Sequence, residues 1–227
     1  MASITDAEWQ ALWVSLSVGA LSLAVSMPFA VVVGWALARW QFWGKTALDI
    51  IVHAPLVMPP VALGYVLLLA FGPRGPLGEP LYEWFGITIA FSWTGAVIVA
   101  AVSGFPLAVR AVRISAESVE ERLLQAARTL GQSAFGAFAT VAVPLMIPGI
   151  VAGAVLAFAR ALGEFGATIT FAASIPGETR TLPLALHGFL QTPGGEDAAL
   201  RILILSIGVA VTALIASEYL IRRARRR

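Results

Sequence analysis

Charged residues are confined to short stretches of this chain, and the segments between them are long and apolar. About 20 consecutive apolar residues span the hydrocarbon core of a bilayer as a helix. The alternating pattern of a membrane β-strand is absent, so helices are the consistent assignment. The pattern therefore predicts an all-α integral membrane protein that crosses the bilayer five times. The expected crossings are residues 10–38, 47–71, 86–109, 138–162 and 200–221.

Prolines and glycines interrupt two of these segments. Pro55, Pro59 and Pro60 remove backbone donors and predict a bend or break in the second crossing. Residues 141–171 would form one helix about 46 Å long, which is too long for one crossing. We expect this helix to break at Gly163 and Gly166. Residues 181–191 have a helical apolar pattern but are too short to span, so they predict an external or re-entrant helix; a sixth crossing is the alternative.

Composition supports a membrane protein and excludes several other classes. Of the 227 residues, 59% are hydrophobic and 12% charged, and the mean hydropathy is +0.85. That balance leaves too little polar surface for a soluble enzyme, a disordered regulator or a nucleic-acid-binding module. The absence of cysteine excludes disulfides, thiolate metal sites and a cysteine nucleophile. The expected surroundings are membrane lipids and not nucleic acid. Much of the basic charge lies in one C-terminal tail, at Arg222, Arg223, Arg225, Arg226 and Arg227.

Basic residues predict the orientation of the crossings. With the N-terminus outside, the inner segments hold eleven Lys and Arg residues and the outer segments hold three. Basic residues favour the cytoplasmic side, so we expect the N-terminus outside and the C-terminus in the cytoplasm. The first segment carries Asp6 and Glu8 in place of a basic leader, which predicts an uncleaved helix rather than a signal peptide. The expected location is the bacterial inner (plasma) membrane.

The polar loop at 110–137 contains an amphipathic stretch, Glu117 to Gln132. Gly131 occupies the position of a helix-terminating glycine. Such a helix could lie on the bilayer surface or dock in a groove of a soluble partner, and periodicity alone leaves both interpretations open. One helical face collects its apolar residues: Val119, Leu123, Ala126, Ala127 and Leu130.

The same loop resembles the cytoplasmic signature of importer permeases of the ATP-binding-cassette class. That signature reads Glu-Ala-Ala, three residues, Gly, nine residues, Ile-x-Leu-Pro. Here the spacing is matched by Gln125-Ala126-Ala127, then Gly131, then Val141-x-Val143-Pro144, with Gln125 in place of the glutamate.

The resemblance implies an importer-permease (MetI-like) fold in one domain, residues 1–227, with a cytoplasmic coupling helix. In that family the helix docks on a separate ATPase, and the chain itself is not an enzyme. The expected assembly is a homodimer of this chain with two ATP-binding subunits and a periplasmic or other extracytoplasmic oxyanion-binding protein. No phosphate-binding loop of the G-x-x-x-x-G-K-[ST] type occurs in the sequence, so no cofactor is expected here, and ATP and magnesium belong to the partner. The coupling residues implied are Leu123, Gln125, Ala126, Ala127, Leu130 and Gly131.

Further segments resemble oxyanion permeases. Pro55–Pro60 with Gly64-Tyr65, and Phe158–Thr168, look like the molybdate and sulfate/thiosulfate permeases. Residues 175–181 and 191–196, within an external segment at about 172–199, look like molybdate permeases in particular. The resemblance implies translocation of molybdate by alternating access. The alternatives are sulfate, thiosulfate or tungstate as cargo and, more remotely, a stand-alone channel, a secondary transporter or an intramembrane enzyme.

The residues themselves suggest a transport path. Arg160 and Glu164 lie one helical turn apart, and ionisable groups inside a membrane are functional candidates, although a structural ion pair is the other interpretation. A free glutamate would repel an oxyanion, so Glu164 should be neutralised by Arg160 or turned from the path. Threonine hydroxyls can contact a dianion without trapping it. The candidate path residues are Pro59, Pro60, Arg160, Gly163, Glu164, Gly166, Thr168 and Thr170.

Two other pairs have simpler interpretations. Asp49 and His53, at i and i+4, predict a hydrogen-bonded pair rather than a metal site, because no third ligand is spaced to join them. Gly149 and Gly153 form a G-x-x-x-G face, which favours close packing of helices.

Overall fold

The computed structural model describes residues 4–225, and every regular element in that range is a helix. The side chains of residues 217, 218 and 220–225 lie outside the description, as do residues 226–227. The side chains of the arginines in the expected basic tail therefore lie outside the description.

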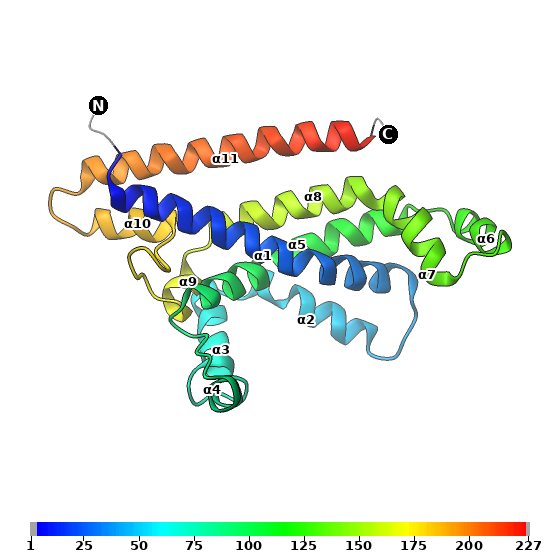
Figure 1. The fold of residues 1–227 in the computed structure, drawn as a ribbon, viewed down its shortest axis with the longest axis horizontal. Helices are drawn as coiled ribbons and strands as arrows, with labels where there is room; N and C mark the ends of the chain where they lie inside the picture. The colour runs from blue at the N-terminus through cyan, green and yellow to red at the C-terminus, as the bar shows by residue number, and fades with distance from the viewer. Residues whose placement is uncertain (1–3, 226–227) are drawn as a thin grey trace.

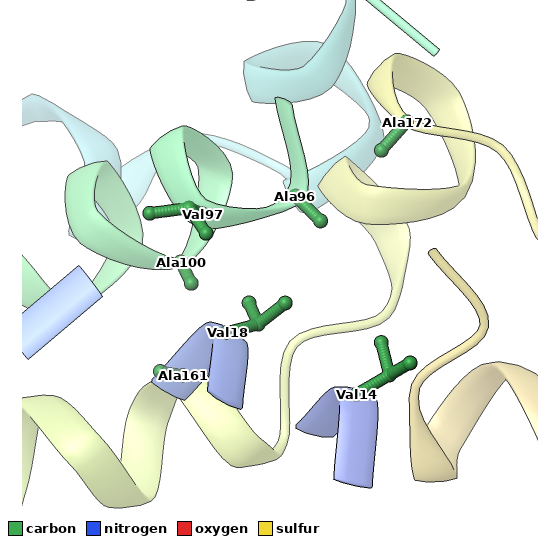
Figure 2. Close-up of a cluster of buried hydrophobic side chains, with 7 residues drawn as sticks. All are labelled: Val14, Val18, Ala96, Val97, Ala100, Ala161 and Ala172. Carbon is green, nitrogen blue, oxygen red and sulfur yellow. The ribbon is translucent and has the colours of Figure 1, made fainter. Parts of the chain in front are cut away.

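Three long helices form the body of the protein: α1 (Asp6–Arg39), α5 (Trp93–Glu117) and α8 (Val143–Leu162). They run side by side along the long axis of the molecule (Figure 1). Figure 2 shows one cluster of small buried side chains where α1, α5, α8 and the residue that follows α9 (Gly166–Phe171) meet: Val14, Val18, Ala96, Val97, Ala100, Ala161 and Ala172. Side chains this small let the helices approach closely.

The contact between α5 and α8, called here the α5–α8 seam, brings side chains of one helix against the backbone of the other. A Cβ atom built on Gly149 would lie 2.2 Å from Cβ of Ser115, and one on Gly153 would lie 3.1 Å from the carbonyl oxygen of Ala108. On the other side, a Cβ on Gly104 would lie 2.9 Å from the carbonyl oxygen of Ala157. The packing role predicted for Gly149 and Gly153 is confirmed.

The expected second crossing, 47–71, is broken as its prolines predicted. It forms α2 (Lys45–Val57) and α3 (Pro60–Phe71), with extended backbone at Met58. Pro60 occupies the first position of α3, where the missing N–H costs no hydrogen bond. The short α4 (Gly78–Phe85) follows, and α3 and α4 project away from the body (Figure 1).

Four described helices are long and apolar enough to span a membrane: Asp6–Arg39, Trp93–Glu117, Ala134–Leu162 and Glu196–Ala216. Three of the five expected crossings therefore correspond to helices with nearly the predicted bounds, and the second is the broken pair. The expected crossing 86–109 is wrong in its bounds. Ser92 caps the N-terminus of α5 through its side chain, and Arg110 and Arg113 lie within the helix, which continues to Glu117.

Three further helices start near the end of the body where α1 begins (Figure 1). α8 stops at Leu162 with Gly163 as its C-cap, and α9 (Gly166–Phe171) starts three residues later, so the predicted break is confirmed. The predicted short helix at 181–191 is α10 (Leu182–Leu190). The last helix, α11 (Glu196–Arg225), starts beside α1, where Arg201 Nε lies 2.8 Å from Oε1 of the fully buried Glu8. Figure 1 shows α10 and the start of α1 at one end of the molecule, and the loop between α5 and α8 extends beyond the other end.

Candidate functional site

The loop between α5 and α8 forms a separate lobe at one end of the molecule. It contains α6 (Glu121–Thr129), the short α7 (Ala134–Ala137) and a π-helical turn, η1 (Phe138–Ala142), which leads into α8. Figure 1 shows this lobe beyond the ends of α1 and α5. The predicted helix across 117–132 is shorter than expected, because Glu120 has extended backbone and separates α5 from α6.

Gly131 ends α6 in the way the sequence predicted. Its φ is +90°, in the left-handed region that side chains rarely adopt. The amide of Gln132 donates to the carbonyl of Ala127, and the amide of Gly131 donates to the carbonyl of Arg128, both at 3.1 Å. These two bonds form a Schellman motif, which satisfies carbonyls that the helix leaves free.

The apolar residues of α6 do not form the single face that the sequence suggested. Leu123 is 45% exposed and Leu130 86% exposed, and Ala126 is exposed between them. Ala127 is half-buried, and Val119, which precedes the helix, is buried. None of residues 121–129, all of them described, is buried. The exposed stripe of α6 therefore consists of Leu123, Ala126 and Leu130.

The base of the lobe is fixed to the helical body. Val119 lies in a buried cluster with Val112 and Ala116 of α5 and Met146 of α8, and Leu124 packs against this cluster. These buried contacts fix the orientation of α6, and its exposed stripe faces away from the helical body.

A groove of about 460 Å³ separates α6 from the end of α1. Gln125 and Arg128 line it from α6, opposite Trp35 and Trp40. The Gln125 side chain donates a long hydrogen bond of 3.5 Å to Oε1 of Glu121. Gln125, the one departure from the family signature, therefore faces the groove and not the exposed stripe.

The aliphatic and proline part of the signature begins in the π-helical turn, with Val141, and ends in the first turn of α8, with Val143 and Pro144. The amide of Val143 donates to the carbonyl of Phe138, five residues earlier. Pro144 has no N–H to donate and its ring crowds the preceding turn, conditions that favour a wider turn at this point.

The predicted path residues gather where α3 meets α9, but the structure gives them different surroundings. A Cβ on Gly166 would lie 2.8 Å from Cβ of Pro60, so backbone and proline ring are in close contact there. The Thr170 hydroxyl donates to the carbonyl of Gly166 at 2.8 Å. Pro59, Pro60 and Gly163 are exposed, Thr170 is half-buried, and Gly166 and Thr168 are buried. Their role as path residues stays a prediction.

Arg160 and Glu164 form the ion pair that their spacing suggested. Arg160 Nη1 lies 2.5 Å from Glu164 Oε2, and the other carboxylate oxygen accepts a hydrogen bond of 2.9 Å from the amide of Ala167 in the first turn of α9. Glu164 is 2% exposed and Arg160 28% exposed. The glutamate is therefore neutralised, as an anion path would require, and it also links the end of α8 to the start of α9.

A charged cavity of about 540 Å³ lies between α2 and α5. The predicted Asp49–His53 pair is confirmed at 3.0 Å, and Asp49 also contacts Arg113 of α5 at 3.0 Å. Arg113 contacts Glu117 at the same distance. Within the described residues there is no cluster of three or more side chains suited to hold a metal ion.

Sequence reasoning missed long-range contacts of Arg39 and Arg201, as it missed the contact of Arg113 with Asp49. Arg39 and Arg201 were counted as loop charges, but Arg39 binds backbone carbonyls at the end of α5, and Arg201 pairs with Glu8. The only available signals were their positions at helix ends and, for Glu8, the capping box with Thr5. Neither signal identifies a partner far away in sequence.

Comparisons with known proteins agree with this architecture. Residues 28–226 match the family described as "Binding-protein-dependent transport system inner membrane component". The chain is 55% identical over 224 residues to the molybdenum transport system permease protein ModB of Escherichia coli (strain K12), covering 99% of this chain and 98% of that protein. It is 49% identical over 220 residues to the ModB protein of Haemophilus influenzae, covering 97% and 96% of the two chains.

Solved structures share the fold at low sequence identity. The inward-facing methionine ABC transporter MetNI matches with a TM-score of 0.68 at 15% identity, covering 97% of this chain and 95% of that one. A bacterial ABC transporter that imports alginate matches with a TM-score of 0.72 at 15% identity, covering 98% of this chain and 80% of the other.

Proposed function

The chain belongs to the family of binding-protein-dependent transport system inner membrane components, and on this premise we propose that it is the membrane permease subunit of an ATP-driven importer of molybdate. The cargo is taken from the ModB relatives, which are named as molybdenum permeases and align over nearly the whole chain. The expected action is alternating access, driven by an ATPase on a separate chain.

The observation that carries the proposal is the exposed stripe of α6. Leu123, Ala126 and Leu130 present apolar surface on a helix that lies outside the helical body. An amphipathic helix of this kind can be bound in a groove of a partner protein. The alanine between two leucines leaves room for close approach, so we assign α6 as the coupling helix that an ATPase subunit holds.

The proposed assembly contains two copies of this chain, two ATP-binding subunits and an external oxyanion-binding protein. Exposed apolar side chains on α2 and α3 supply surface for a second copy, among them Ile50, Ile51, Val57, Val61 and Leu69. ATP and magnesium are expected on the partner. With α6 and the C-terminus in the cytoplasm, α10 would face the binding protein.

The proposed path for the anion passes the break between α2 and α3 and the start of α9. Neutralisation of Glu164 by Arg160 removes a repulsive charge from this region. In this proposal the Thr170 hydroxyl exchanges its hydrogen bond to the carbonyl of Gly166 for one to the passing anion, a contact without a fixed positive charge that would trap a dianion.

Reconstitution tests the proposal. In liposomes, labelled molybdate should enter only when this chain, its ATPase subunit, the binding protein and ATP are all present. Uptake by the chain alone would point to a channel or secondary transporter. Excess unlabelled molybdate, tungstate and sulfate, added separately as competitors of labelled molybdate, test the cargo. Stronger competition by sulfate than by unlabelled molybdate would contradict the assignment.

A second experiment tests the orientation. A reporter inserted after Gln132 should be cytoplasmic and one inserted at Gly194 should be external. The opposite result at Gln132 would separate α6 from any cytoplasmic ATPase.

A further inference from the structure

The last turn of α1 touches both ends of the loop that carries α6. Arg39, the last residue of α1, contacts the start of this loop. Its Nε and Nη2 atoms donate to the carbonyl oxygen of Ala116, at 3.0 and 2.8 Å. The Nη2 atom also donates to the carbonyl of Val119. A single guanidinium therefore spans the end of α5 and the connection to α6.

Trp35, one turn earlier on α1, extends this contact to the other end of the loop. Its ring lies 5.6 Å from the Arg39 guanidinium carbon and packs edge-on against Phe138 of the π-helical turn, with ring centroids 5.0 Å apart. Trp35 and Arg39 thus join α1 to the segments that enter and leave the lobe.

The chemistry of these contacts distinguishes Arg39 from an ordinary loop charge. Carbonyls at the C-terminal end of a helix carry partial negative charge, and the carbonyl of Ala116 in the last turn of α5 is one of them, although it also accepts a hydrogen bond of 3.3 Å from the amide of Val119. A planar guanidinium can donate to the carbonyls of Ala116 and Val119 at once, whereas an ammonium group is a single point charge. Among the described residues Arg39 forms no ion pair, so its charge is directed at α5 and at the Trp35 ring.

We propose that Arg39 is a positioning residue of energy coupling, which fastens α1 to the start of the α6 lobe so that a displacement of α6 moves α1 together with α5. This inference rests on the function proposed above. Without the guanidinium, Val119 and Leu124 would still hold α6 near α5, but α1 would be joined to the lobe only through apolar contacts. Movement of the ATPase would then reach α1 only through its apolar packing against α5, without a directional hydrogen bond that ties α1 to the lobe.

The test compares Arg39→Gln, Arg39→Lys and the control Lys45→Gln in the full complex with the ATPase subunit and binding protein. Lys45 begins α2, six residues after Arg39, and its side chain forms no hydrogen bond or ion pair within the described part of the chain; only its backbone amide donates, to the carbonyl of Phe42. Three quantities are measured: complex recovered, ATP hydrolysed, and molybdate transported per ATP.

Arg39→Gln should assemble and hydrolyse ATP within about twofold of wild type, while molybdate transported per ATP falls about tenfold, the scale of a lost charge-assisted hydrogen bond. Arg39→Lys should lie between Arg39→Gln and wild type, and Lys45→Gln should match wild type. A merely structural role would lower the amount of complex and leave the ratio unchanged.

An unchanged transport ratio in Arg39→Gln would overturn the inference. If Arg39→Gln does not assemble, Arg39→Lys decides, because it keeps the charge: a wild-type ratio overturns the inference and a reduced ratio supports it. Wild-type complex that moves no molybdate would instead refute the proposed function, so the two failures are distinguishable.

Discussion

The α5–α8 seam and the helix α6 are built from the same kind of small residues, yet they have opposite surroundings. At the seam, Gly149 and Gly153 lie against Ser115 and Ala108, and a single added methyl group would overlap Ser115 and crowd Ala108. In α6, Ala126 faces away from the protein between two exposed leucines. The seam is complete within one chain, whereas the exposed stripe of α6 has no covering within the described part of the chain. Small residues therefore have to be interpreted by what lies beside them.

The largest expected effect is at the seam. Gly149→Val would place its Cβ 2.2 Å from Ser115 Cβ and force α5 and α8 apart. Overpacking a tight contact costs roughly 3 kcal/mol, so little folded protein should be recovered. The measurement is the yield and thermal stability of detergent-solubilised protein.

Gly208→Val in α11 is the matched control, since no other described atom lies within 4 Å of a Cβ built there. It should keep wild-type yield. Equal losses in the two variants would mean that β-branching, and not the seam contact, causes the damage.

Ala126→Trp should give the second-largest effect and change function without changing the fold. The side chain would extend into solvent, so insertion and thermal stability should match wild type. A bulky side chain on the exposed stripe of α6 should lower both co-purification with the ATPase subunit and molybdate uptake, by more than about tenfold. Normal uptake would favour the alternative in which α6 lies on the bilayer surface.

Gly131→Val should have an intermediate effect. A Cβ there meets no described atom within 4 Å, so the cost comes from the backbone alone. Holding a side-chain residue at φ +90° costs about 1–2 kcal/mol, which should loosen the Schellman motif and reduce uptake severalfold. Faster amide hydrogen exchange at Gln132 would identify the cause, and Gly131→Asn should be milder because asparagine tolerates this conformation.

Gln125→Glu should have the smallest effect. The new carboxylate would lie one turn from Glu121 and within i+3 reach of Arg128, so repulsion and attraction of a few tenths of a kcal/mol nearly cancel. Uptake should stay within about twofold of wild type. A large loss would show that an uncharged side chain is needed in the groove beside Trp35.

Local chemistry predicted much of this architecture. The broken second crossing followed from Pro59 and Pro60, the end of α8 from Gly163, and the end of α6 from Gly131, because proline and glycine act on their own backbone. The Arg160–Glu164 and Asp49–His53 pairs followed from helical spacing for the same reason.

Features that depend on distant contacts could not be obtained in this way. Hydropathy places helix ends at charges, so α5 was expected to end before Arg110, whereas Arg113 is accommodated by Asp49 on another helix. Similarly, Val119 was assigned to the face of α6 because the pattern of apolar residues does not show where Glu120 interrupts the helix. The carbonyl partners of Arg39 could not be recognised from the sequence, because every residue has the same backbone carbonyl oxygen whatever its side chain.

The π-helical turn before α8 determines the direction in which the exposed stripe of α6 faces. A π-turn contains one residue more than an α-turn, and each residue of an α-helix advances the chain by about 100° around its axis. Deleting one residue from Phe138–Ala142 would leave the sequence and the side chains of α6 unchanged, but it would rotate the whole lobe by about a quarter of a turn around the axis of α8. The length of the nine-residue interval between Gly131 and Val141 thus sets the direction in which Leu123, Ala126 and Leu130 face. This direction is independent of how well these three side chains fit the surface of a partner.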